Sequence, residues 1–394
     1  MISVEKIDEW IKEAAERPES AGQIIQRIAR RLSELSERNE ELLAENIGLQ
    51  SGAKVEEYER RIAHLEYQLE LLKRRFGGEL PEELDTPSQA ALNLLVYDRH
   101  GRVLRWVLQA HDASSGKLVA SLAGELAYQE EPPRLLAAVS GEELLFIFTS
   151  GRVAALALES IPVSELEGLT VWEQASIPSE PKAGERLACI TLIGRIALAE
   201  FFVQVSRKGC VKKIRASMGQ SILANHYIGT GIRQPPDQTF SLALCNQDDR
   251  LALVSYEGFL QCVEVKTLPP AVEEALRLES SDHLVTAFVP ATGRAVVAMT
   301  QVGKAIHWTA DRLEVANSFR TRGQALFSKI RREEGARVVG ADAVSEADWG
   351  AALHSNGQVS LHTAAEILRS GAIPVQDELL AFIFFPLPWM NASG

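Results

Sequence analysis

Short apolar stretches recur along residues 90–394, and each leads into a polar turn that ends in glycine. Leu251-Ala252-Leu253-Val254, for example, precede the turn at Gly258, and a second apolar stretch follows it. Two apolar runs joined by a glycine turn are typical of a β-hairpin, because glycine readily adopts the positive φ that a tight turn needs. The turns lie about fifty residues apart, and their glycines are Gly101, Gly151, Gly209, Gly258, Gly303 and Gly357.

A repeat of this length indicates a ring of small sheets, because one such sheet cannot bury both of its faces alone. We therefore predict a mainly β fold, a six-bladed β-propeller or β-pinwheel over residues 90–394, preceded by an N-terminal α-helical coiled coil. Residues 377–385 repeat the apolar run of residues 142–148 but end without a glycine turn. We expect this last segment to pair with the first unit and close the ring, which removes exposed sheet edges.

The first part of the chain has a helical pattern instead. Residues 1–19 predict a short amphipathic helix, residues 20–76 a coiled coil or helical hairpin, and residues 77–89 an acidic, proline-bounded linker. Heptad spacing predicts that the first helix of the coil mediates oligomerisation through Ile25, Ile28, Leu32, Leu35, Asn39, Leu42, Asn46 and Leu49.

The heptad register changes across Ser51-Gly52-Ala53. Two arrangements are consistent with this change: a parallel coiled coil that joins two chains, or an antiparallel hairpin within one chain. Asn39 and Asn46 at core positions favour the parallel homodimer, because buried asparagine selects the oligomeric state of a coiled coil.

Composition narrows the classes of function. The net charge of −12 argues against bulk attraction to nucleic acid or anionic membranes. No run of residues is long and apolar enough to cross a bilayer, and the first residues lack the features of a secretory signal, so we expect a cytoplasmic protein with no membrane partner. The four cysteines lack metal-ligand spacing and no nucleotide-binding or catalytic motif is present, so we predict no metal, no cofactor and no enzymatic activity.

Basic residues nevertheless concentrate around two of the turns. A hairpin turn lies at the rim of a blade, where cations can meet the phosphates of a DNA duplex. The candidate DNA-binding residues are Arg207, Lys208, Lys212, Lys213, Arg215, Arg233, Arg320, Arg322 and Lys329. The alternative is that these are ordinary solvated turns, which are commonly charged.

Residues 201–214, with the turn Ser206-Arg207-Lys208-Gly209, resemble the repeat of the C-terminal domain of DNA gyrase A and its topoisomerase IV counterpart. The resemblance covers residues 90–394 and implies a six-bladed β-pinwheel that wraps DNA, without a strand-cleaving domain. The chain departs from the family pattern because the glycine-rich basic box is absent in recognisable form, with residues 320–324 and 217–220 as its nearest candidates.

Together these features predict a non-catalytic protein that binds double-stranded DNA by wrapping or bending it, tethered by a coiled coil. The alternative is a protein–protein interaction scaffold that has kept the pinwheel but does not bind DNA. The acidic net charge and the missing basic box favour this alternative.

Overall fold

The computed structural model describes Gly22 and residues 91–387, with gaps at 110–112, 124–130, 166–169, 197, 229–231 and 233–238. The chain divides into two units, Met1–Pro87 and Ser88–Gly394. Apart from Gly22, the predicted amphipathic helix, coiled coil and linker lie outside the described residues, and so do all the predicted oligomerisation positions. The description below therefore concerns the second unit.

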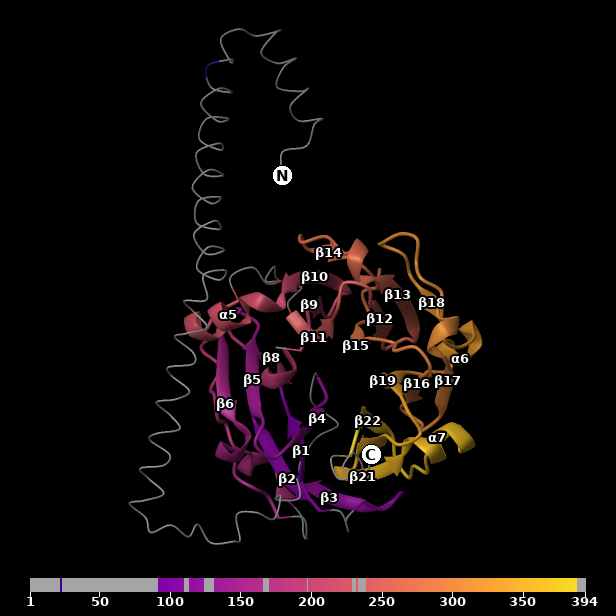
Figure 1. The fold of residues 1–394 in the computed structure, drawn as a ribbon. Coiled ribbons are helices and arrows are strands. Elements are labelled where there is room, and N and C mark those ends of the chain that lie inside the picture. The colour runs from indigo at the N-terminus through magenta and orange to yellow at the C-terminus, as the bar shows by residue number, and fades with distance from the viewer. Residues whose placement is uncertain are drawn as a thin grey trace, which may run out of the picture. The chain divides into compact units, whose positions relative to one another are not determined.

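The strands of the described residues form six small sheets (Figure 1). In chain order of their central strands, the first sheet has the order β2-β1-β4, the second β6-β5-β8, the third β11-β9-β10-β14, the fourth β15-β12-β13-β18, the fifth β17-β16-β19 and the sixth β22-β20-β21-β3-β7. The strands are β1 Leu92–Tyr97, β2 Val103–Leu108, β3 Leu118–Ala123, β4 Arg134–Val139, β5 Glu143–Phe148, β6 Val153–Ala157, β7 Thr170–Val171, β8 Leu187–Leu192, β9 Phe201–Ser206, β10 Cys210–Arg215, β11 Thr239–Cys245, β12 Arg250–Ser255, β13 Phe259–Glu264, β14 Glu273–Glu274, β15 Leu284–Phe288, β16 Ala295–Thr300, β17 Ala305–Thr309, β18 Gln324–Ala325, β19 Val338–Val344, β20 Trp349–His354, β21 Gln358–Thr363 and β22 Leu379–Phe385.

Short helical turns connect these strands. The α-helices are α4 Ile193–Ile196, α5 Gly219–Asn225, α6 Lys329–Glu333 and α7 Ala364–Ser370. The 3₁₀ turns are η4 Leu158–Ser160, η5 Trp172–Gln174, η6 Ala216–Met218, η7 Val265–Thr267 and η8 Ala310–Arg312. In the part of the chain that the structure describes, none of the helices is long and apolar enough to span a membrane.

Each sheet is built around the apolar run that precedes a turn glycine. This run forms the central strand, the residues after the glycine form an outer strand, and a third strand pairs on the inner side, as in β9 with β10 and β11. All six residues of β1 are buried, whereas β6 alternates between buried and more exposed residues. A continuous apolar run is expected for a strand that is covered on both faces, and alternation for one that is covered on a single face.

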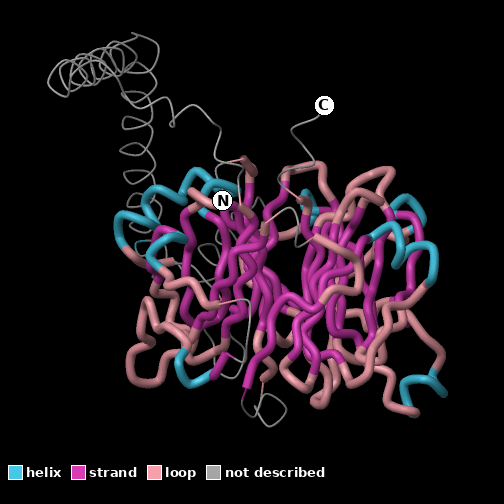
Figure 2. Tube along the Cα trace, turned by 90° about the horizontal axis from the view of Figure 1, so that it is seen from below, coloured by secondary structure: helices cyan, strands magenta, loops and turns pink. Residues whose placement is uncertain are grey.

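The sheets follow one another around a common centre (Figures 1 and 2). Six hydrophobic clusters among the described residues each lie between two neighbouring sheets, from the pair formed by the first and second sheets to the pair formed by the sixth and first. Alternate residues of a central strand therefore pack in opposite directions. Leu94 packs toward the sixth sheet and Leu95 toward the second.

Each repeat of about fifty residues, called a unit from here on, also contributes a backbone segment to the outer edge of the preceding sheet. Strand β14, which follows β13 of the fourth sheet in the chain, pairs with β10 of the third sheet. Strand β18 in turn pairs with β13, and single bridges from Ser176, Tyr227 and Ala372 extend the outer strands of the first, second and fifth sheets. The repeated outer edge is thus a joint between units that are consecutive in the chain.

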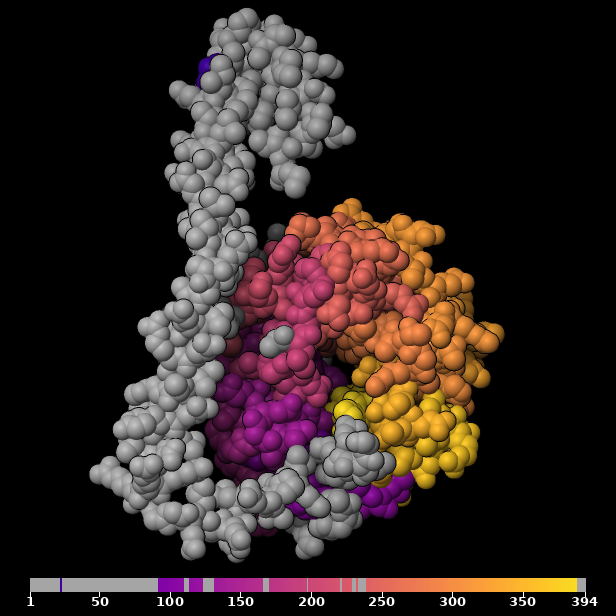
Figure 3. Space-filling model, in the orientation of Figure 1, coloured from indigo at the N-terminus to yellow at the C-terminus, as the bar shows by residue number. Residues whose placement is uncertain are grey.

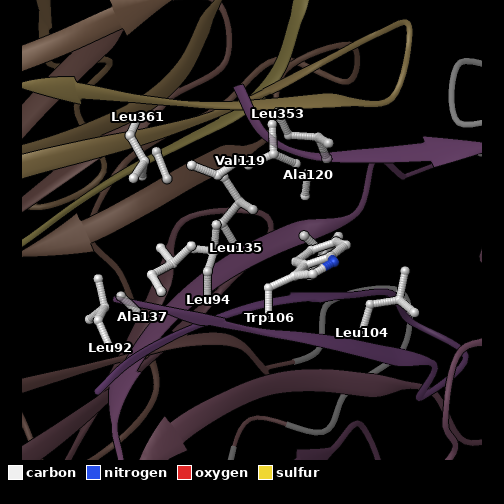
Figure 4. Packing of buried hydrophobic residues seen from close by; sticks show 14 of the residues in the cluster. Leu92, Leu94, Leu104, Trp106, Val119, Ala120, Leu135, Ala137, Leu353 and Leu361 are labelled. Atoms are coloured by element: carbon white, nitrogen blue, oxygen red, sulfur yellow. The ribbon is translucent and has the colours of Figure 1, made fainter. Parts of the chain in front are cut away.

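The sixth sheet receives its outer strand from the first unit. Strand β3 pairs with β21, and its Val119 and Ala120 lie between the cores of the first and sixth sheets, beside Leu94 and Leu353 (Figure 4). The prediction that residues 377–385 make this link was wrong, because β22 pairs with β20 of its own sheet. In the sixth unit this apolar run takes the inner position that β4 or β8 takes in earlier units, and strand β3 of the first unit links the sixth sheet to the first.

The turn glycines serve both the hairpin and this joint. All six have positive φ, between 73° and 92°. At Gly209 and Gly357 a Cβ would also overlap a backbone carbonyl oxygen of the incoming segment, that of Leu276 and of Leu122 respectively. The same glycine carbonyls accept hydrogen bonds from these segments, for example from Leu122 N to Gly357 O at 2.9 Å. A side chain at either position would strain the turn and displace the incoming segment from the outer edge of the sheet.

Candidate nucleic-acid interface

Two of the contributed segments lie side by side at the outer edges of the third and fourth sheets. Residues 273–277 complete the third sheet and residues 320–325 complete the fourth. Between them, Arg320 N donates to Glu274 O at 3.0 Å and Arg277 N donates to Thr321 O at 2.8 Å. The two segments therefore form one continuous outer surface, which α6 extends along the chain.

This surface carries six basic side chains, which we call the arginine edge: Arg277, Arg320, Arg322, Lys329, Arg331 and Arg332. Five of them are exposed, and Arg332 is half-buried. The guanidinium groups of Arg322 and Arg332 lie 4.5 and 4.8 Å from the centre of the Phe259 ring. Stacking on an aromatic face holds an arginine extended while leaving its N–H groups available at the rim.

Carboxylates are interspersed with these cations. Arg320 Nε lies 3.0 Å from Glu273 Oε1, Arg322 Nη1 lies 3.3 Å from Glu279 Oε1, and Lys329 Nζ lies 3.6 Å from Glu333 Oε1. The three basic side chains remain 68%, 51% and 80% exposed. Exposed pairs of this kind contribute only about 0–1 kcal/mol each, so a phosphate can replace the carboxylate as partner at little cost.

Two hollows flank Arg322. One, of about 490 Å³, is lined by Glu257, Arg322, Lys329, Arg332, Glu333 and Arg337. The other, of about 460 Å³, is lined by Arg277, Leu278, Glu279, Ser280, Arg320 and Arg322. Because both are lined by several arginines, each can receive an anionic group that approaches from solvent.

The lysines of β10 form a separate group on the third sheet. Lys213 Nζ donates to Val265 O at 2.9 Å and lies 5.0 Å from the Phe201 ring centre. Burial, and to a smaller extent the charge of Arg215, lowers the pKa of Lys213. Lys212 is half-buried and Arg215 is exposed. These residues lie in one strand, but only Arg215 has the exposure of the arginine edge.

The two cations of the turn before Gly209, Arg207 and Lys208, have different partners. The carboxylate of Glu131 pairs with Arg207, whose pKa is lowered by burial. Lys208 Nζ donates to the carbonyl oxygens of Ser280 and Asp282, at 3.0 and 2.9 Å. The structure thus brings together Arg320, Arg322 and Lys329 from the predicted set. It pairs Arg207 with Glu131 and holds Lys208 on Ser280, which lines one of the two hollows beside Arg322. Arg233 lies outside the described residues.

Sequence reasoning missed Arg277 as a site residue. It stands in a stretch rich in glutamate and proline, so its local charge is unremarkable. Its position relative to the turns is the signal that could have revealed it, because Arg277 ends the segment, residues 273–277, that completes the preceding sheet.

Among the described residues, no group of three or more His, Cys, Asp and Glu side chains is placed to hold a metal ion. The four cysteines are free thiols, and Cys189, Cys245 and Cys262 are buried. Burial raises the pKa of Cys189 and Cys245 to about 12, so these thiols are unreactive at neutral pH.

Comparison with known proteins gives a fold but no close relative. No family model matches the sequence, and no curated protein matches it. Among solved structures, the chain is similar to the C-terminal domain of DNA topoisomerase IV, with 16% identity, a TM-score of 0.50 and coverage of 77% of this chain and 97% of that one. It is also similar to the DNA gyrase A C-terminal domain, with 12% identity, a TM-score of 0.55 and coverage of 75% and 99%. The chain therefore has the mainly β fold of these two C-terminal domains, as the repeat predicted.

Proposed function

We propose that this protein is a non-catalytic DNA-binding protein that holds duplex DNA along the arginine edge of a six-bladed β-pinwheel. In this proposal each of the six sheets is one blade, and the joints between them form the rim that the duplex follows. The fold is shared with domains of DNA gyrase and DNA topoisomerase IV, which act on DNA as their names state.

The observation that carries the proposal is the exposure of the arginine edge. Five exposed cations lie on adjoining segments. Three of them, Arg320, Arg322 and Lys329, form ion pairs with carboxylates that are themselves partly exposed. Arginine binds phosphate through two parallel hydrogen bonds, and a duplex presents phosphates at close, regular intervals. These side chains stand on a rim rather than on an element that fits a groove, so we expect contacts with the DNA backbone and little sequence preference.

The heptad pattern of residues 20–76 supports a second part of the proposal, a coiled coil that joins two chains. A parallel coiled coil through Ile25, Leu32 and their heptad neighbours would join two chains and give the dimer two rims. Two weak sites on one molecule bind a long duplex more tightly than either site alone. Light scattering tests the tether, because a dimer has twice the 43.2 kDa mass of the chain.

A protein–protein scaffold is the second candidate. It is favoured by the net charge of −12 and by the carboxylates within the arginine edge itself, namely Glu257, Glu273, Glu279 and Glu333. The same edge would then bind an acidic segment of a partner protein, and duplex DNA would not bind.

Fluorescence anisotropy of a labelled duplex, titrated with the full chain over a salt series, distinguishes the two. DNA binding should weaken steeply with salt, with a slope of about −0.9 per phosphate contacted. Reversing three charges together, Arg320→Glu, Arg322→Glu and Lys329→Glu, should weaken binding about a thousandfold.

The matched control is a chain with Lys182→Glu, Lys304→Glu and Arg369→Glu, three exposed basic residues away from the arginine edge. It has the same change in net charge and should bind nearly as the unaltered chain does. Equal losses in both variants would mean that bulk charge controls binding and that the arginine edge is not the interface. No binding by the unaltered chain at low salt would favour the scaffold.

A further inference from the structure

The six turns and the starts of the inner strands lie on the same face of the ring of sheets. In each sheet the last residue of the central strand pairs with the first residue of the inner strand, for example Ser255 with Leu284 and Thr300 with Val338. Inner strands surround the centre, where the molecule is hollowed (Figure 3). Side chains at the start of these strands therefore gather around one mouth of the central opening.

A pocket of about 340 Å³ lies at this mouth. Five inner strands contribute residues close to their starts, Arg134, Phe240, Leu284, Val338 and Leu379. The second position of three turns contributes Arg207, Tyr256 and Gln301. The repeat thus places equivalent positions around one site, but with different side chains, so that the pocket has two chemically distinct sides.

One side is cationic. Arg207 pairs with Glu131, and Arg99 Nη1 lies 3.5 Å from the same carboxylate. Arg134 is fixed nearby, because its Nη1 donates to Ala188 O and Phe240 O at 2.7 Å each and its guanidinium group lies 3.6 Å from the Phe240 ring centre. Two half-buried guanidinium groups, those of Arg99 and Arg207, thus share one carboxylate, and the charge of Arg134 lies close enough to act on Arg207. This excess of positive charge favours a further anion.

The other side is aromatic and polar. The rings of Tyr256 and His283 are stacked, with centroids 4.7 Å apart. Gln301 is held by Nε2 donating to Gly335 O at 2.5 Å and by Oε1 accepting from Arg337 N at 2.6 Å. Burial, and then the charges of Arg207, Lys208 and Arg134, lower the pKa of His283 to about 4, so the imidazole is neutral at pH 7. Glu378 lines the same side and provides an acceptor for an amino group.

We propose that this pocket binds a small ligand that joins a phosphate group to a planar ring, as a mononucleotide does. The phosphate lies against Arg207 and Arg134, and the ring lies against Tyr256 and His283. A volume of this size lies at the lower end of the range of ligand pockets, about 300–1,000 Å³. The site is distinct from the arginine edge, so it does not depend on DNA binding.

Isothermal titration of the full chain with AMP and GMP, and separately with adenosine and inorganic phosphate, tests the proposal. A nucleotide should bind at least about tenfold more tightly than either of its parts, because only the nucleotide meets both sides of the pocket. Arg207→Gln should weaken nucleotide binding about tenfold, while Arg312→Gln, an exposed arginine of η8 that does not line the pocket, should leave it unchanged.

Two further variants keep the test independent of folding and of the DNA site. Tyr256→Leu should weaken nucleotide but not phosphate binding, and far-ultraviolet circular dichroism of both pocket variants should match the unaltered chain. The triple arginine-edge variant should keep nucleotide binding. The proposal is overturned if nucleotides do not bind at millimolar concentration, if phosphate alone binds equally well, or if Arg207→Gln has no effect in a folded chain.

Discussion

Arginines of the first two sheets and those of the arginine edge are equally visible in the sequence but have opposite roles in the structure. Arg105 is buried, and its Nε donates to Asn93 Oδ1 at 2.7 Å while its Nη1 donates to the carbonyl oxygens of Leu158 and Ile161. Arg152 lies 3.7 Å from the Phe148 ring centre and forms an ion pair with Glu185. Arg320 and Arg322, by contrast, are more than half exposed.

The difference shows that the number of cations in a unit does not locate an interface. The first two sheets use arginine to satisfy buried carbonyl oxygens and a carboxylate, so their positive charge is already neutralised or enclosed. The arginine edge exposes its charge to solvent. Mutations of arginine contacts in the first two sheets should therefore change stability, whereas mutations on the arginine edge should change DNA binding.

The largest effect on stability is expected at Arg105. Arg105→Ala removes three hydrogen bonds and leaves Asn93 Oδ1 and two backbone carbonyl oxygens without their arginine donor in a buried place, at a cost of about 3 kcal/mol. Urea denaturation followed by tryptophan fluorescence measures this. Arg312→Ala, at an exposed position, should change the free energy of unfolding by less than about 0.5 kcal/mol. Similar small losses in both variants would contradict the structural role of Arg105.

A smaller effect, dependent on pH, is expected at Glu185. Burial alone would raise its pKa, but hydrogen bonds from Arg152, Ser150 and Lys182 N outweigh burial and lower the pKa to about 2. The unfolded chain takes up the proton near pH 4.5 and the folded chain does so only near pH 2. The contribution of Glu185 to stability is therefore present above pH 4.5 and is lost as the pH falls through this range.

Glu185→Gln should remove that dependence, about 1 kcal/mol after allowance for solvent screening. The measurement is the difference between variant and unaltered chain in urea denaturation at pH 5 and at pH 3, which cancels the titration of other groups. A difference that stays constant between the two pH values would show that folding does not lower the pKa of Glu185.

Substitutions on the arginine edge are expected to change duplex affinity rather than stability. Arg322→Ala should weaken duplex binding about fivefold, because one charged contact is worth about 1 kcal/mol. Arg322→Lys should recover only part of the loss, since lysine cannot form two parallel hydrogen bonds to a phosphate. Fluorescence anisotropy at low salt measures both, and full recovery by lysine would show that charge alone is read at this position.

The smallest effect is expected for Lys329→Ala. The pair with Glu333 is exposed and lies within one helical turn, so the free energy of unfolding should change by less than about 0.5 kcal/mol. Duplex affinity should fall about twofold to threefold. A loss of stability above about 1 kcal/mol would show that Lys329, like Arg105, has a structural role. It would contradict the distinction between the first two sheets and the arginine edge.

Local signals explain what could be predicted from the sequence. A hairpin needs only neighbouring residues, so its apolar runs and its glycines, such as Gly209, are visible without knowledge of the rest of the chain. The repeat of these hairpins then leads to a mainly β fold of several small sheets, as found.

The contributed segments could not be predicted in the same way. Strand β14 has two residues, and its partner β10 belongs to the preceding unit, so neither length nor periodicity marks it. The closing strand was misassigned for this reason, and Arg277 was missed. Arg207 and Lys208 are neighbours in one turn, yet one pairs with Glu131 and the other with carbonyl oxygens beyond Leu278, because their surroundings come from different units.

The pairing of β3 with β21 has a consequence for synthesis of the chain. The contact between Thr363 N and Ser115 Oγ, beside this pair, joins residues 248 positions apart. On the ribosome, β3 is made while most of the ring does not yet exist, and every later unit must emerge before its partner strand does. The first unit therefore remains without its final partner through most of translation, and the nascent chain must be kept from pairing β3 with another exposed edge until the last unit is released.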